Sequence, residues 1–140
     1  MATLNPYVHF NGNCEEAFTL YKQVFGGEFV TFMRYSEGPQ DGKLSDEELT
    51  KIMHVSLPIG SSTLMGSDIP GNYPPATIGN NFYISVDAAS KEEADKLFAG
   101  LSKNGKVQMP MADTFWGSYF GMCTDAFNVG WMISYAQRRG

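Results

Sequence analysis

The two histidines of this 140-residue chain are its only side chains that ordinarily titrate close to neutral pH. His54 lies in the run Ile52–Leu57, where apolar and polar residues alternate. That alternation predicts a strand whose apolar side chains face a buried layer, so that His54 and Ser56 lie on the opposite face. We therefore predict that His54 acts as an acid, a base or a ligand-binding group. The alternative is a structural histidine whose hydrogen bond comes from a neighbouring strand or loop.

The other reactive residue types are better explained by structure than by chemistry. Cys14 and Cys123 have no CxxC spacing and no evident base partner, so both are expected to be packing residues. The pairs Glu15-Glu16 and Glu92-Glu93 each occupy the first turn of an expected helix, where carboxylates cap the backbone and complement the helix dipole. No nucleophile–base arrangement of the Ser/His/Asp or Cys/His kind is evident.

A pattern that occurs twice must position these residues. The stretches 13–27 and 90–105 each begin with a capping residue, contain Glu-Glu-Ala, carry an apolar stripe and end at glycine. Each predicts a helix that begins with a capping box, formed by Asn13 with Glu16 and by Ser90 with Glu93. The second stripe consists of Ala94, Leu97, Phe98 and Leu101.

Strands surround both predicted helices in the same order. They are expected over residues 7–11, 28–35, 52–59, 62–67, 81–86, 106–111, 119–124 and 130–135. Each half thus runs strand, helix and three strands, and such a unit has a sheet face that it cannot bury alone. We predict an α+β fold of two βαβββ modules in one compact domain. The first module covers residues 1–68, a linker rich in Pro and Gly covers 69–79, and the second module covers 80–140.

Composition excludes several classes of partner. The net charge of −5 and the absence of a basic cluster argue against nucleic acid. No apolar segment approaches the roughly 20 residues of a membrane span, and the start of the chain lacks the features of a signal peptide. Two cysteines without a pairing pattern indicate a reducing compartment. We predict a cytoplasmic protein that contacts neither nucleic acid nor membrane.

The repeat and several motifs resemble the vicinal oxygen chelate superfamily, which includes glyoxalase I, bleomycin-resistance proteins and extradiol dioxygenases, and more narrowly its PhnB-like branch. These motifs are Asn5-Pro6-Tyr7, the residues 11–17, Phe25-Gly26-Gly27, Met53-His54, the residues 64–68, Phe115-Trp116-Gly117 and the residues 131–134. The resemblance implies a curved mixed sheet with a concave ligand cleft, and a homodimer. The methyltransferase label often attached to this branch has no support, because no Gly-rich loop follows the first strand.

Catalytic members of the superfamily hold a divalent metal with His and Glu or Gln side chains. The resemblance places the corresponding positions at about Pro6, Asn81 and Met132. Proline offers no side-chain donor, asparagine is a weak neutral one, and a thioether suits soft metals. We therefore predict no metal and no other cofactor, with an unrecognised metal site around His54 as the alternative.

The same register assigns residues to the two faces of the sheet. It places Val8 and Phe10 in the cleft, and it places His9 on the helix side with Tyr7, as a structural histidine. In the second module it places Phe82, Ile84 and Val86 under the helix. The predicted ligand-binding residues are Ser56, Thr63, Met65, Asn81, Tyr83, Trp116, Phe120, Met122 and Met132.

Three functions are compatible with this cleft. The first is a metal-free module that binds a small apolar or aromatic molecule, because thioether and aromatic side chains dominate the predicted lining. The second is a lyase or isomerase of the glyoxalase type, which works through a non-standard metal site or through His54 alone. The third is a structural or regulatory dimer whose own side chains fill the cleft. We expect the binding module.

Overall fold

A computed structural model describes residues 2–39 and 42–137. The chain forms two compact units, Met1–Thr77 and Ile78–Gly140, which we call the N-terminal and C-terminal units. The N-terminal unit contains β1 (Tyr7–Phe10), α1 (Cys14–Phe25), β2 (Thr31–Arg34), a 3-10 turn (Tyr35–Glu37), α2 (Asp46–Leu49), β3 (Ile52–Ile59) and β4 (Ser62–Asp68). The C-terminal unit contains β5 (Ile84–Asp87), α3 (Lys91–Ser102), β6 (Lys106–Asp113), β7 (Ser118–Thr124) and β8 (Gly130–Ala136).

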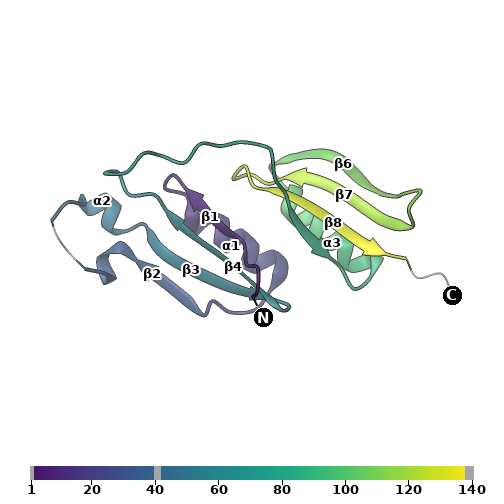
Figure 1. The fold of residues 1–140 in the computed structure, drawn as a ribbon, viewed down its shortest axis with the longest axis horizontal. Coiled ribbons are helices and arrows are strands. Elements are labelled where there is room, and N and C mark those ends of the chain that lie inside the picture. The colour runs from purple at the N-terminus through teal and green to yellow at the C-terminus, as the bar shows by residue number, and fades with distance from the viewer. Residues whose placement is uncertain (1, 40–41, 138–140) are drawn as a thin grey trace. The chain divides into compact units, whose positions relative to one another are not determined.

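Each unit folds its strands into one mixed four-stranded sheet (Figure 1). The strand order is β1-β4-β3-β2 in the first sheet and β5-β8-β7-β6 in the second. The first strand of each unit runs parallel to the last, and the other neighbours are antiparallel. The predicted α+β fold of two βαβββ modules is therefore confirmed.

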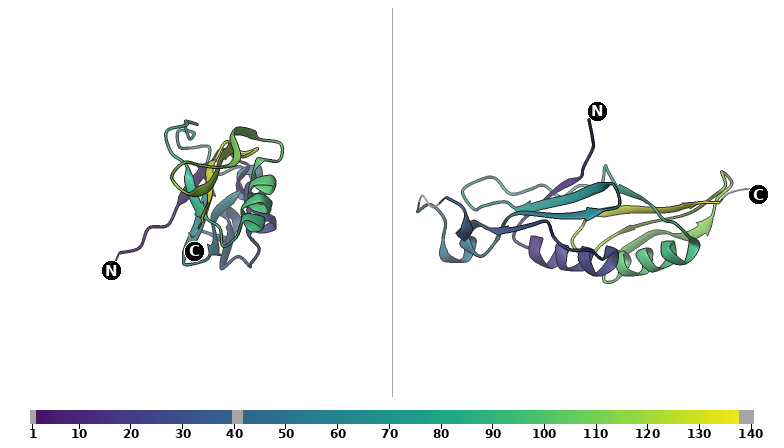
Figure 2. Two further views of the ribbon diagram at one scale, coloured as in Figure 1. Left: turned by 90° about the vertical axis from the view of Figure 1, so that its right-hand side faces the viewer. Right: turned by 90° about the horizontal axis from the view of Figure 1, so that it is seen from below.

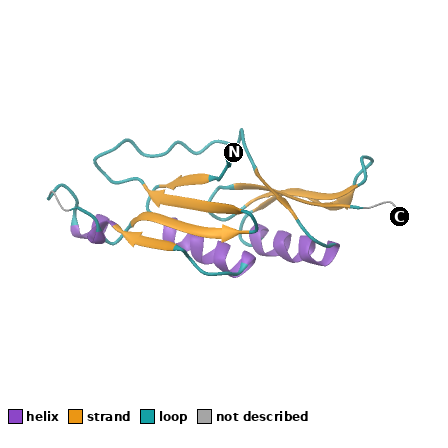
Figure 3. Ribbon diagram, turned by 60° about the horizontal axis from the view of Figure 1, so that its bottom comes forward, coloured by secondary structure: helices purple, strands orange, loops and turns teal. Residues whose placement is uncertain are grey.

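One long helix covers one face of each sheet (Figures 2 and 3). Helix α1 packs against β3 and β4, and α3 packs against β6, β7 and β8. The predicted stripe of α3 is buried at all four of its positions, as expected for an amphipathic helix on a sheet. We call the sheet face away from the long helix the open face of that unit. Within the described residues, no helix has the length and apolar character needed to cross a membrane.

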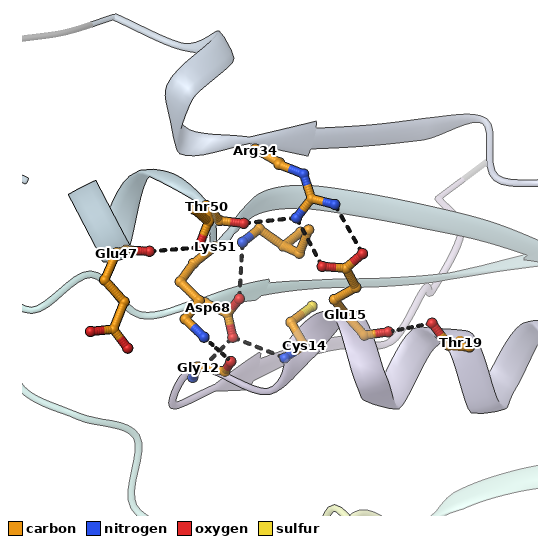
Figure 4. A network of polar contacts seen from close by, with 10 residues as sticks. Gly12, Cys14, Glu15, Thr19, Arg34, Glu47, Thr50, Lys51 and Asp68 are labelled. Atoms are coloured by element: carbon orange, nitrogen blue, oxygen red, sulfur yellow. Dashed lines mark hydrogen bonds and ion pairs between the residues drawn. The ribbon is translucent and has the colours of Figure 1, made fainter. Parts of the chain in front are cut away.

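The carboxylate of Asp68 organises the start of α1 (Figure 4). Its Oδ1 accepts hydrogen bonds from the backbone N–H groups of Gly12 at 3.0 Å and Cys14 at 2.9 Å, and its Oδ2 accepts one from Ile52 at 2.9 Å. The Asp68 residue is only 2% exposed. The predicted capping box of Asn13 and Glu16 is wrong, because the Asn13 side chain makes no capping bond. A charged acceptor from another strand takes that place, and it also complements the helix dipole.

The other predicted helix start is closer to the structure. Ser90 accepts from the backbone N–H of Glu93 at 3.0 Å, whereas the Glu93 carboxylate accepts from Ala89 rather than from Ser90. Only half of that capping box is therefore present. A complete box, formed by Ser45 and Glu48, begins the short helix α2.

Two predicted strands begin too early. Strand β2 starts at Thr31 instead of residue 28, and β5 starts at Ile84 instead of residue 81. Ile84 pairs with Trp131, the second residue of β8, so Asn81 and Phe82 lie beyond the start of the strand with which they would have to pair. Phe82 consequently does not lie under α3 as predicted, and 61% of its surface is exposed.

Glu15 links the first turn of α1 to strand β2. Its carboxylate accepts two hydrogen bonds from the Arg34 guanidinium, at 2.8 and 2.9 Å, and Arg34 also donates to the carbonyl of Thr50. The hydrogen bond from Arg34 lowers the pKa of Glu15 below its usual 4.5. The ion pair is partly exposed, so its contribution to stability is modest.

We predict that Asp68→Asn lowers the free energy of unfolding by about 2–3 kcal/mol, measured by urea denaturation. The amide keeps one acceptor oxygen but turns an N–H₂ group toward a buried N–H donor. Asp46→Asn, at an exposed position in the first turn of α2, is the control and should change stability by less than about 0.5 kcal/mol. Equal midpoints for both variants would contradict the role of Asp68.

We predict that Glu15→Gln costs about 0.5–1 kcal/mol at neutral pH and nothing in acid. A lowered folded-state pKa means that the carboxylate stabilises the fold above its usual pKa of 4.5, and that this stabilisation is lost as the pH falls through the lowered value. Urea denaturation of both proteins across this pH range measures the difference. Glu16→Gln is the control, since Glu16 makes no ion pair with any described residue; a pH-independent difference for Glu15→Gln would refute the assignment.

Candidate functional site

Both histidines lie on the open face of the N-terminal unit. In the sheet, Val8 pairs with Gly66, and a Cβ atom added to Gly66 would lie 2.6 Å from Cε1 of Phe18 in α1. Val8 and Gly66 therefore face the helix. Because side chains alternate along a strand, the neighbours Tyr7 and His9 face the other way.

The prediction for the first strand is thus wrong, because its side chains point to the faces opposite to those expected. His9 and Tyr7 were expected on the helix side, and Val8 and Phe10 on the other. Phe10 is instead 3% exposed and packs edge-on against Phe18, with ring centroids 6.2 Å apart. The apolar residues of β1 fill the layer under α1, and this burial decides the face.

Tyr7 connects the two imidazoles. Its hydroxyl lies 3.2 Å from Nδ1 of His54, and its ring centroid lies 5.6 Å from that imidazole and 5.2 Å from the ring of His9. Nδ1 of His9 lies 3.3 Å from the hydroxyl of Ser67. Each Nδ1 atom is therefore engaged, whereas neither Nε2 atom has a hydrogen-bond partner in the part of the chain that the structure describes.

Sequence reasoning placed His54 on this face but missed Tyr7 and His9. The signal was present in Val8-His9-Phe10, where two apolar residues flank a polar one. Alternation anchored on those apolar residues, rather than on Pro6, places His9 beside His54. The role of His54 itself stays a prediction.

The remaining predicted residues of the N-terminal unit differ in what they offer to a ligand. Met65 is half-buried and pairs with Tyr7 on one side and Ser56 on the other. Ser56 is 6% exposed, and its hydroxyl already accepts from the backbone of Thr31 at 3.1 Å. Thr63 lies near the start of β4, where its backbone donates to the Asn5 side chain at 2.9 Å. All three lie on the open face, because Ser56 pairs with Met65 and Thr63 stands two residues from Met65 along β4. Met65 is the one that pairs with Tyr7, and we call Tyr7, His9 and His54 the Tyr7–histidine cluster.

The open face of the C-terminal unit is apolar. Met122 pairs with Met132, and Phe120 pairs with Ser134, so these four residues share one face. The ring of Trp116, in the turn between β6 and β7, lies 5.9 Å from the ring of Phe120 in an edge-on arrangement. We call Trp116, Phe120, Met122 and Met132 the apolar band. The opposite face belongs to the helix layer, because the hydroxyl of Tyr119 donates to Asp95 of α3.

A hollow of about 420 Å³ lies within the C-terminal unit. Tyr83, Lys106, Thr124 and Gly130 are among its lining residues. The ring of Tyr83 lies over Gly130, where an added Cβ atom would be 2.7 Å from Cδ2 of the ring. The predicted residue Asn81 lies outside β5 and is exposed.

Neither cysteine is a candidate nucleophile. Cys14 and Cys123 are fully buried. Burial raises the pKa of the Cys14 thiol well above its usual range, and it raises the pKa of Cys123 to about 11. Both side chains are therefore neutral thiols at physiological pH.

The donors available do not suit the metal site of the superfamily. Pro6 and Met132 provide no hard donor, and Asn81 is an exposed neutral amide. Across residues 2–39 and 42–137, no three His, Cys, Asp or Glu side chains come together in a way that could hold a metal ion.

Known proteins share this fold over nearly the whole chain. A family model described as the Glyoxalase/Bleomycin resistance protein/Dioxygenase superfamily matches residues 3–133. Protein YjdN of Escherichia coli (strain K12) is 32% identical over an alignment of 144 residues, and the alignment covers 97% of this chain and 97% of that protein. The crystal structure of protein PA1353 from Pseudomonas aeruginosa has 41% identity and a TM-score of 0.87, covering 99% of this chain and 100% of that one. A Bacillus cereus structure named as a putative 3-demethylubiquinone-9 3-methyltransferase, PhnB protein, has 22% identity, a TM-score of 0.75 and coverages of 96% and 100%, and shows likeness of fold alone.

We predict that neither thiol reacts with a disulfide reagent such as Ellman's reagent in the native protein, and that both react once the protein is unfolded. Burial excludes the reagent and disfavours the thiolate. Ser61→Cys, in the exposed turn between β3 and β4, is the positive control and should react at once. Rapid labelling of the native wild-type chain would show that one thiol is accessible after all.

Proposed function

The chain belongs to the glyoxalase/bleomycin resistance protein/dioxygenase superfamily, and from this starting point we propose that it binds a small apolar or aromatic molecule without the help of a metal. The apolar band of the C-terminal unit is the observation that carries the proposal. It presents two thioethers and two aromatic rings on a sheet face that α3 does not cover.

The chemistry of the band suits an aromatic ligand. Thioether side chains are flexible and polarizable, so they adapt to the outline of a ring and make favourable sulfur–aromatic contacts. Phe120 and Trp116 offer edges and faces against which a ring packs. Burial of apolar area supplies affinity, and a few polar groups are enough to orient the molecule.

The Tyr7–His54 pair favours a second candidate, a lyase or isomerase that moves a proton. The tyrosine hydroxyl can donate to Nδ1, which makes Nε2–H a donor toward the open face, or accept from Nδ1–H, which makes Nε2 a base. Such a pair supports proton transfer without a metal. A metal-dependent form of this activity would need donors beyond those gathered here, since no three His, Cys, Asp or Glu side chains come together among the described residues.

We also propose a homodimer, as the resemblance implies. Strand β6 lies at one edge of its sheet, where Val107 and Met109 are 52% and 44% exposed. Phe115, in the turn after β6, is 93% exposed. A second copy of the chain would remove this apolar surface from water. The two buried free cysteines fit the cytoplasmic location that we propose.

We predict that aromatic molecules from a broad panel raise the melting temperature of the protein and quench its tryptophan fluorescence. Phe120→Ala should weaken binding of the best ligand about tenfold, because it removes part of the surface against which a ring packs. Val30→Ala, at a position that is 75% exposed in the N-terminal unit, is the matched control. If no member of the panel stabilises the protein, the proposal fails. If His54→Ala abolishes turnover of a panel member while the fold is intact, the enzyme alternative replaces it.

A further inference from the structure

We infer that the ligand is an aromatic carboxylate, whose ring lies on the apolar band and whose carboxylate is held by Lys106 in the adjoining hollow. This inference rests on the proposed function, because the band is where the ring would bind. It adds the chemical class of the molecule and the site of its charged end. The inference is carried by residues of the C-terminal unit alone.

The hollow continues the open face that carries the apolar band. Lys106 of β6 pairs with Thr124 of β7, which pairs with Gly130 of β8, so the three residues form one row across the sheet. Thr124 and Gly130 each lie two residues along their strands from Met122 and Met132. Residues two apart share a face and lie about 7 Å from each other. A molecule the length of a fused ring with one substituent therefore spans from the band to this row.

Gly130 allows an aromatic wall to form over the hollow. Because it has no side chain, the ring of Tyr83 rests on its backbone; a Cβ atom there would lie 2.7 to 3.1 Å from three atoms of the ring. Phe82, which is 61% exposed, also lines the hollow. Two neighbouring rings beside a flat stretch of backbone favour a planar ligand group.

Lys106 is the charged side chain of the hollow that has no ion-pair partner among the described residues. The other charged lining residue, Asp125, is 3% exposed, and its oxygens accept from the backbone of Phe127 and Val129 and from the indole of Trp131. That carboxylate is buried and hydrogen-bonded to its own turn and to the first part of β8. The ammonium group of Lys106 makes no ion pair with any residue that the structure describes. In a chain of net charge −5, this leaves a local positive site.

The side-chain amides of three asparagines and one glutamine complete the polar lining. The carboxamides of Asn80, Asn104 and Asn128 line the hollow, and within the described chain none of them has a side-chain hydrogen bond. Gln108 uses its amide nitrogen to donate to the hydroxyl of Thr124 at 2.9 Å, which leaves its oxygen as an acceptor. One ammonium matches the single charge of a carboxylate, and amide N–H groups can bind its second oxygen. A dianion would leave one charge without a cation.

Binding of naphthoate and of its neutral counterpart naphthamide tests this inference. Titration of tryptophan fluorescence with each probe should show about tenfold tighter binding of naphthoate at low salt, as for a charge-assisted hydrogen bond. Added salt should reduce that preference, because exposed charges are screened. Lys106→Gln should abolish the preference and leave naphthamide binding unchanged. Lys103→Gln is the matched control, since Lys103 is also exposed but lies outside the hollow.

The outcomes separate this inference from the proposed function. If both probes bind with equal affinity to the wild-type protein, the ligand class is wrong and the proposed function stands. If naphthoate is preferred but Lys106→Gln retains the preference, the charge is held elsewhere and the inference is overturned. If neither probe binds, the inference is overturned, and failure of the aromatic panel as well removes the proposed function. Gly130→Ala, which displaces the ring of Tyr83, should weaken both probes if the hollow is the site.

Discussion

A buried negative charge requires compensation from its surroundings, and in the N-terminal unit the carboxylate of Asp68 receives it from three backbone N–H groups. Two of these groups belong to the start of α1 and the third to the start of β3. The residue stands at the end of β4, opposite Phe10 of β1. Its side chain thus joins the start of α1 to β3 and to its own strand β4. The backbone carbonyl of Asp68 separately accepts a hydrogen bond from the hydroxyl of Tyr35 at 2.7 Å.

The position of α1 decides the chemistry of the rest of the unit. Once the helix starts beside Asp68, Phe18 reaches the backbone at Gly66, and the apolar residues of β1 must face it. Tyr7 and His9 are left on the opposite face with His54. The Tyr7–histidine cluster therefore follows from where the helix is capped, although none of its members contacts the capping residue through its side chain.

The two units use one topology for different surfaces. The N-terminal open face gathers two imidazoles, a phenol and a hydroxyl, whereas the C-terminal open face gathers thioethers and aromatic rings. Asp125 acts locally in the second unit: it closes the turn between β7 and β8 and binds the indole of Trp131. Asp125 lines the same hollow as Lys106, yet it is buried and hydrogen-bonded in this way, and Lys106 makes no ion pair with any described residue. The fold supplies the two platforms, and the side chains on them carry whatever function the protein has.

Local patterns in the sequence were enough to predict the elements and their order. The stripe of α3, the hairpin of β3 and β4 and the two βαβββ modules all follow from periodicity and turn residues that lie close together in the chain. The resemblance placed Phe120, Met122 and Met132 together, and the strand pairing does put these three on one face.

Only the tertiary structure decided the features that depend on distant residues. Asp68 caps a helix that begins 54 residues earlier, a distance over which no local pattern is visible, so sequence reasoning assigned the cap to Asn13 instead. His9 lies on the face opposite to the predicted one, because a shift of one residue reverses every side chain of a strand. The packing of Phe10 against Phe18 decides which face each residue of β1 takes. The hollow at Lys106 forms where the residues before β5 place the ring of Tyr83 over Gly130 of β8. Periodicity determines what each segment is, and long-range packing determines which side chains meet.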